Sequence, residues 1–113
     1  MKIRSHKPGD IEWITHRHGL IYAEEYSWDE TFEALVADIY AQFIRHHDHL
    51  RERIWIVEID GERVGTVMIV DSGEQVAQLR LLLVEPKARN KGIGKQLINE
   101  CIDFSKEKGY KKN

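Results

Sequence analysis

The sequence predicts an α/β fold of the α+β kind, with its elements in the order β-α-α-β-β-β-α. Apolar residues recur at helical spacing in three segments. Between the second and third of these segments the pattern changes to three short runs rich in β-branched residues, separated by turn signals. No repeat, low-complexity stretch or linker interrupts the 113 residues, so we expect a single domain covering residues 1–113.

The N-terminal part predicts one strand and then one helix. Residues 2–6 form a short strand that Pro8 and Gly9 end, and Asp10 is expected to be the N-cap of the helix that follows. The apolar face of this helix is expected to contain Ile11, Ile14, His18, Ile21 and Tyr22.

The second helix has the stronger signature. Ser27 and Glu30 form the S-x-x-E pattern of a capping box, in which each side chain bonds the other residue's backbone N–H. An apolar stripe follows at helical spacing, consisting of Phe32, Leu35, Val36, Ile39, Tyr40 and Phe43.

The three runs after this helix predict an antiparallel meander. The first two runs, 54–59 and 64–70, are joined by Asp60-Gly61, a type I′ turn signal because both central residues take positive φ. The third run, 76–84, ends at Pro86, which lacks the N–H needed for a ladder.

The last helix carries the most informative segment of the chain. Its apolar period begins after Gly92, and Gly109 is expected to cap its C-terminus. The loop before it contains Arg89, Lys91 and, in the first turn, Lys95. Unpaired backbone N–H groups, the helix dipole, glycines and basic side chains together favour binding of a pyrophosphate there.

Other nucleotide-binding motifs do not match this segment. The G-x-x-x-x-G-K-[ST] loop of nucleotide-binding proteins is absent, and the single G-x-G is not the G-x-G-x-x-G of dinucleotide sites. Taken alone, R-x-x-G-x-G is a weak signal that also describes an ordinary basic helix start. Its position between a meander and an amphipathic helix favours the phosphate site.

In this segment the chain resembles the GNAT-type N-acetyltransferases, whose diphosphate pattern R/Q-x-x-G-x-G/A matches Arg89, Gly92 and Gly94. It is especially similar to the acetyltransferase half of proteins that fuse a MarR-like regulator to a GNAT domain. The resemblance implies a GNAT fold and transfer of an acetyl group from acetyl-CoA to a primary amine of a small molecule or protein. It also implies a binding site for the cofactor's pantetheine and diphosphate, formed by Leu82, Leu83, Val84, Arg89, Asn90, Lys91, Gly92, Ile93, Gly94 and Lys95.

The chain departs from the family pattern at two places. The family's C-terminal β-α-β-β is missing, because residues 110–113 stand where its fifth strand would begin. A tyrosine that protonates the thiolate in relatives therefore has no counterpart. Gln78 stands where many relatives have a glutamate base. A non-catalytic CoA-binding or oligomerising remnant, and a fragment of a longer enzyme, remain the alternatives to an active enzyme.

An acidic, aromatic segment joins the two N-terminal helices. By the same resemblance it borders the acceptor site, and Glu24 or Glu25 is the candidate general base. The alternative is an ordinary helix end with a cap and two core aromatics. A metal site at His46, His47 and His49 is disfavoured relative to a solvated helix end.

Composition and net charge restrict the kinds of partner and the cellular compartment that we expect. The net charge of -2 argues against bulk nucleic-acid binding, and no apolar run predicts a signal peptide or a membrane span. Cys101 is the only cysteine and is expected to be a buried hydrophobe, so a reducing cytoplasm is expected. The outer edge of the strand at 76–84 is expected to drive homodimerisation.

Overall fold

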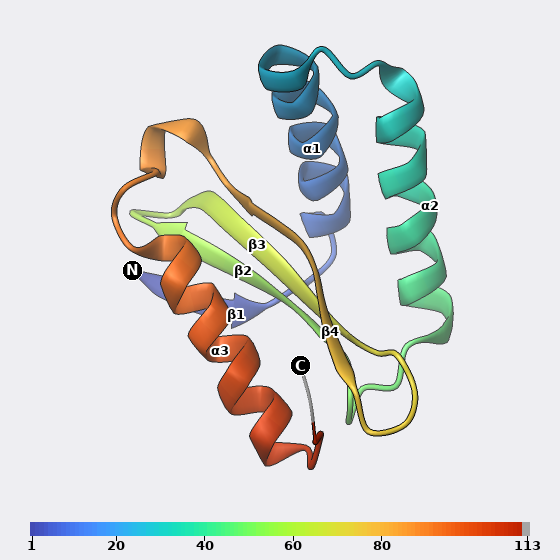
Figure 1. The fold of residues 1–113 in the computed structure, drawn as a ribbon. Coiled ribbons are helices and arrows are strands. Elements are labelled where there is room, and N and C mark those ends of the chain that lie inside the picture. The colour runs from blue at the N-terminus through green and yellow to red at the C-terminus, as the bar shows by residue number, and fades with distance from the viewer. Residues whose placement is uncertain (112–113) are drawn as a thin grey trace. The chain divides into compact units, whose positions relative to one another are not determined.

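The structure, a computed structural model, describes residues 1–111. Of residues 110–113, where the family's fifth strand would begin, Lys112 and Asn113 lie outside the described residues. The chain divides into two compact units, Lys7–His47 and Met1–His6 with Asp48 onward. The predicted element order is confirmed (Figure 1). No helix among residues 1–111 is both long enough and apolar enough to cross a membrane.

The larger unit contains a four-stranded antiparallel sheet, with the strands in the order β1-β2-β3-β4. The strands are β1 (Lys2–Ser5), β2 (Arg53–Ile59), β3 (Glu62–Asp71) and β4 (Ala77–Val84). The hairpin prediction between β2 and β3 is confirmed, since Asp60 and Gly61 have φ values of 52° and 79°. Among residues 1–111, β4 pairs only with β3, so its other edge is open.

Helix α3 (Ile93–Glu107) covers one face of this sheet (Figure 1). Its buried residues Leu97, Cys101 and Phe104 pack in one core cluster with Trp55 and other sheet side chains. The start of α3 lies very close to β3, because a Cβ on Gly65 would lie 3.2 Å from the Ile93 side chain. The glycine in β3 thus sets how closely the helix start approaches the sheet.

The end of α3 follows the predicted glycine cap. Gly109 has φ 82°, and its N–H donates to the Lys106 carbonyl at 3.2 Å. The Tyr110 N–H donates to the Ser105 carbonyl at 3.0 Å, which completes a Schellman motif.

Arg51 ties the segment after this cap to the rest of the larger unit. Its guanidinium donates to Asp71 at 3.2 Å and to the Lys108 carbonyl at 2.9 Å. Its carbonyl accepts from the Tyr110 hydroxyl at 2.6 Å. The Lys111 N–H then donates to the Gln75 carbonyl at 2.7 Å, so the chain leaving α3 lies beside the residues that lead into β4.

The smaller unit is an antiparallel pair of helices, α1 (Asp10–Tyr26) and α2 (Glu30–His46), shown in blue and teal in Figure 1. Two capping predictions for it are wrong. Gly9 is the N-cap of α1, because the Asp10 carboxylate turns back to accept the Lys7 N–H at 2.8 Å. Ser27 ends α1 with φ 60°, so Asp29 caps α2 and accepts the Thr31 N–H at 3.0 Å.

The aromatic residues of this unit gather where the two helices are joined. Tyr22 stacks on Phe32 with ring centroids 4.7 Å apart, and Trp28 meets Phe32 edge-on at 4.7 Å. Tyr26 and Trp28 are 59% and 49% exposed, so the alternative of two core aromatics is wrong. They are held by stacking on neighbouring rings rather than by burial.

Candidate functional site

The loop between β4 and α3 ends in a helix start with open backbone donors. Gly92 takes the N-cap position in the left-handed conformation, with φ 78°, and no side chain caps the helix. Asn90 also has a positive φ, 66°. The amide groups of the first turn therefore point out of the helix without a side-chain acceptor of their own, the arrangement that binds anions.

Two different physical reasons explain why positions 92 and 94 of this turn are glycines. Gly92 has a backbone conformation that side-chain-bearing residues rarely adopt. Gly94 has no positive φ, and a Cβ there would only touch the Val84 side chain at 4.0 Å. Because the protein itself leaves room at Gly94, the missing side chain keeps space for a group outside the protein. This open space fits a diphosphate.

Basic side chains surround the turn, and one of them is neutralised. Lys87 bonds the Glu62 carboxylate at 2.5 Å, and this ammonium lowers the pKa of Glu62. The Arg89 Nε donates to the Val84 carbonyl at 3.4 Å, which places its guanidinium beside the end of β4. Lys91 and Lys95 are exposed. The loop is therefore positive on the side where the helix begins.

Strand β4 contains an irregularity that sequence reasoning missed. Thr66 lies opposite Leu83 but Met68 lies opposite Arg80, so one β3 residue faces two residues of β4. Leu81 has φ 54° at this bulge, an uncommon conformation for a leucine. No sequence signal marks it, because leucine has no preference for positive φ.

A backbone hydrogen bond just after β4 indicates which groups at the end of this strand face the open edge. The Glu85 N–H donates to the Val64 carbonyl at 2.8 Å, so the groups of Glu85 point toward β3. Alternation from Glu85 then directs the N–H and C=O of Leu83 toward β3 and those of Val84 outward, where the Val84 carbonyl accepts from Arg89. Of the three strand residues expected to hold pantetheine, Val84 presents backbone groups at the edge, whereas Leu82 lies within the bulge.

Both candidate general bases lie in the smaller unit, and Gln78, which stands where relatives have a glutamate, lies in the larger one. Glu24 and Glu25 are exposed in the last turn of α1, in the smaller unit. Gln78 is exposed on β4, opposite Val70 of β3. The structure brings the cofactor-loop residues together in one continuous segment, whereas each glutamate stays a prediction.

The histidines near the end of α2 and the single cysteine were expected to have structural roles rather than chemical ones. His47 stacks on Phe43 with ring centroids 4.3 Å apart. Within residues 1–111, no group of three or more His, Cys, Asp or Glu side chains is placed to hold a metal ion. Cys101 is buried, and burial raises the pKa of its thiol to about 12, so the prediction of a buried hydrophobe is confirmed.

Comparisons with known proteins identify the family of the chain. The acetyltransferase (GNAT) family profile matches residues 12–113, so the chain belongs to the GNAT acetyltransferase family. The chain is 25% identical over 107 residues to spermidine N(1)-acetyltransferase of Escherichia coli K12, covering 92% of this chain and 56% of the relative. It thus spans about half the length of that curated relative. The resemblance to MarR fusion proteins stays a prediction.

Two solved structures have the same fold. A GNAT-family acetyltransferase from Staphylococcus aureus Mu50 superposes with a TM-score of 0.78 at 19% identity, covering 96% of this chain and 68% of the other. A GNAT acetyltransferase from Brucella melitensis, solved in complex with acetyl-CoA, gives a TM-score of 0.75 at 18% identity, covering 96% and 70%. The GNAT fold predicted from the sequence is confirmed.

Proposed function

We propose that this chain transfers an acetyl group from acetyl-CoA to a primary amine. The observation that supports it most is the uncapped, glycine-containing start of α3 beside the open, bulged edge of β4. The helix start suits an anion and the strand edge suits an extended, amide-containing arm. Coenzyme A carries both, as a diphosphate joined to pantetheine.

The cofactor-binding roles follow from these two features. The first-turn amides of α3 would hold the diphosphate, assisted by the positive charges of Arg89, Lys91 and Lys95. The outward N–H of Val84, together with backbone groups of Leu82 in the bulge, would bond the pantetheine arm, as a further strand would. Acetyl-CoA supplies the activated thioester whose acyl group is transferred.

Acyl transfer also requires a hydrogen-bond donor to the thioester carbonyl oxygen and a base that takes a proton from the amine. The amine nitrogen forms a bond to the thioester carbonyl carbon and the carbon–sulfur bond breaks. A backbone N–H at the bulged edge of β4 would stabilise the charge that develops on the carbonyl oxygen. The attacking amine must also lose a proton, for which Glu24 or Glu25, acting through water, is our candidate. Gln78 does not ionise, so it cannot take that proton.

The acceptor class is proposed from the curated relative and from charge. The relative is named for the N(1) amine of spermidine, an aliphatic polyamine. Exposed Glu24, Glu25, Asp29 and Glu30 gather near the α1–α2 connection and suit a cationic acceptor. We therefore propose aliphatic primary amines as acceptors, and the cytoplasm as the compartment.

The test measures free thiol released from acetyl-CoA in the presence of spermidine, a lysine-containing peptide and an aminoglycoside. We expect turnover with at least one amine, below the roughly 10 per second typical of enzymes, because Gln78 replaces an ionisable group. CoA binding without turnover on any amine would favour the CoA-binding remnant. Failure to bind CoA would refute the proposal.

A further inference from the structure

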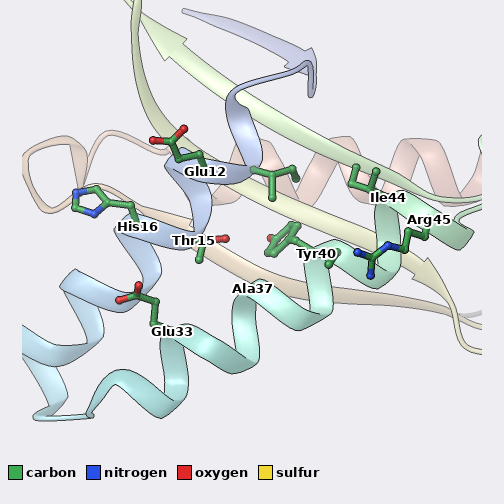
Figure 2. Close-up of a pocket in the computed structure, with 10 residues that line it drawn as sticks. Glu12, Thr15, His16, Glu33, Ala37, Tyr40, Ile44 and Arg45 are labelled. Atoms are coloured by element: carbon green, nitrogen blue, oxygen red, sulfur yellow. The ribbon is translucent and has the colours of Figure 1, made fainter.

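A groove runs between the two helices of the smaller unit. It has a volume of about 620 Å³, and residues of both helices line it, as Figure 2 shows. Ala37 and Ile44 contribute apolar surface from α2, and Glu12 and His16 contribute polar groups from α1. A second hollow of about 330 Å³ adjoins it and shares His16 and Glu33. We call the larger hollow the α1–α2 groove.

The α2 side of this groove has charges of opposite sign at its two ends. In Figure 2, Glu33 lies near one end and Arg45 near the other. Both side chains are exposed, and neither makes a salt bridge or side-chain hydrogen bond with another part of residues 1–111. Their separation of twelve residues corresponds to about 18 Å along the helix. The Glu33 side chain packs against α1, since a Cβ on Gly19 would lie 2.7 Å from its Oε1, but its carboxylate stays exposed. The two charges can therefore meet a partner and are far enough apart to set its direction.

The same face of α2 is symmetric about the level of residue 39. Glu33 and Arg45 lie six residues on either side of that level, and Ala37 and Ala41 lie two residues on either side. A two-fold axis through this level would place a second α2 antiparallel to the first. Glu33 of each copy would then face Arg45 of the other, which is the self-complementarity that a two-fold interface requires.

The apolar residues of the face obey the same symmetry. Ala37 is exposed and Ala41 is partly exposed, and their small side chains allow two helix axes to approach closely. Ile44 is 44% exposed, five residues from the centre. The residue at the corresponding distance on the other side is Ala34, which is exposed and leaves room for an isoleucine.

We propose that the α1–α2 groove is a homodimer interface, in which α2 of one copy packs antiparallel against α2 of a second copy. The dimer expected from the sequence was assigned to the open edge of β4, whereas this surface lies on a different unit and is independent of acetyl transfer. The charges of the groove favour a second copy over a polycation, because Arg45 would repel a polycation at one end and Glu33 would repel a polyanion at the other.

Charge exchange on the intact chain provides the test, with sedimentation equilibrium over a micromolar concentration series. Glu33→Arg and Arg45→Glu should each weaken dimerisation at least about tenfold, because like charges would face each other twice in one dimer. The double variant should restore the wild-type dissociation constant, since Arg at 33 would again meet Glu at 45. Raising the salt from 0.05 to 0.5 M should weaken the wild-type dimer.

Two further variants keep the test independent of folding. Asp103→Arg, at an exposed position of α3, makes the same change of net charge as Glu33→Arg and should leave dimerisation unchanged. Ala37→Gln adds a large side chain at an exposed position, so it should preserve the circular dichroism spectrum while it weakens the dimer. A monomeric wild-type chain, a dimer insensitive to both single exchanges, or a double variant that is not restored would each overturn the proposal.

Discussion

Replacing Gly94 with leucine should separate ligand binding from stability, because the structure predicts opposite signs for the two. The protein leaves space at this position: the nearest atom to an added Cβ is the Val84 side chain at 4.0 Å. Gly94 lies in the first turn of α3 and has no positive φ. A leucine there should therefore raise the free energy of unfolding by about 0.5–1 kcal/mol, since glycine is a poor helix former.

The same side chain would stand where a diphosphate must approach the first-turn amides. A hydrogen bond to a charged group contributes about 1.5–3 kcal/mol, so losing two of them costs about 3–6 kcal/mol. Every 1.4 kcal/mol is tenfold in affinity, so CoA should bind at least about 100-fold more weakly. Gly94→Ala is the matched control, because a Cβ alone meets no close atom and the family pattern accepts alanine.

Titration calorimetry with CoA and thermal unfolding followed by circular dichroism measure the two effects on the same samples. Gly92 is less suitable for this comparison, since its φ of 78° makes any replacement strained. Unchanged CoA affinity in Gly94→Leu, with a melting temperature at or above that of the wild type, would refute the assignment of the diphosphate to this turn. A lower melting temperature would refute the reasoning about space.

Three further predictions concern the larger unit. Gly65→Ala should lower the free energy of unfolding by about 1–3 kcal/mol in urea titrations, because the new Cβ would lie 3.2 Å from Ile93 and the helix start must shift; full stability would show that the core accommodates it. Cys101 should resist alkylation at pH 8 in the folded chain, because a thiol pKa raised from 9.0 to about 12 leaves about a thousandfold less thiolate; rapid labelling without unfolding would contradict this. The pKa of Asp71 is lowered, first by a hydrogen bond from the Gly73 backbone N–H and also by Arg51. The ionised Asp71 carboxylate therefore stabilises the folded chain at pH values above its unfolded pKa of about 3.9, and this stabilisation is lost as the pH falls through the lower folded pKa. Asp71→Asn should make the urea midpoint fall less steeply as the pH is lowered, and an unchanged fall would show that the Asp71 carboxylate does not contribute to it.

The order of helices and strands could be predicted because local signals agree with one another here. The spacing of apolar residues separates helix from strand, and Asp60-Gly61 and Gly109 take the positive φ values that their residue types favour. The loop proposed to bind the diphosphate could also be predicted, since its glycines, charges and helix start are contiguous in sequence. Its contacts with residues distant in sequence include the Lys87–Glu62 ion pair and the close approach of Ile93 to Gly65.

The helix caps were harder to predict, because neighbouring residues compete for the capping position. Ser27 and Asp29 are both good capping residues, and Ser27 is used in the left-handed turn that ends α1. Leu35 matched the apolar stripe of α2 but is 54% exposed. A stripe defined by spacing includes residues at its margin, and only the packed neighbours decide which of them are covered.

By itself, the sequence determined the fold class and the GNAT family pattern, and it predicted an anion site at the start of α3, because each depends on residues that are close along the chain. Only the tertiary structure decided that Leu81 adopts a left-handed bulge, that Val84 presents its carbonyl at the open edge, and that Glu33 and Arg45 lie toward opposite ends of one groove. The physical reason is that strand register and helix pairing are set by contacts between segments distant in sequence. Those contacts determine where a backbone group or a charge points, and no local preference encodes that direction.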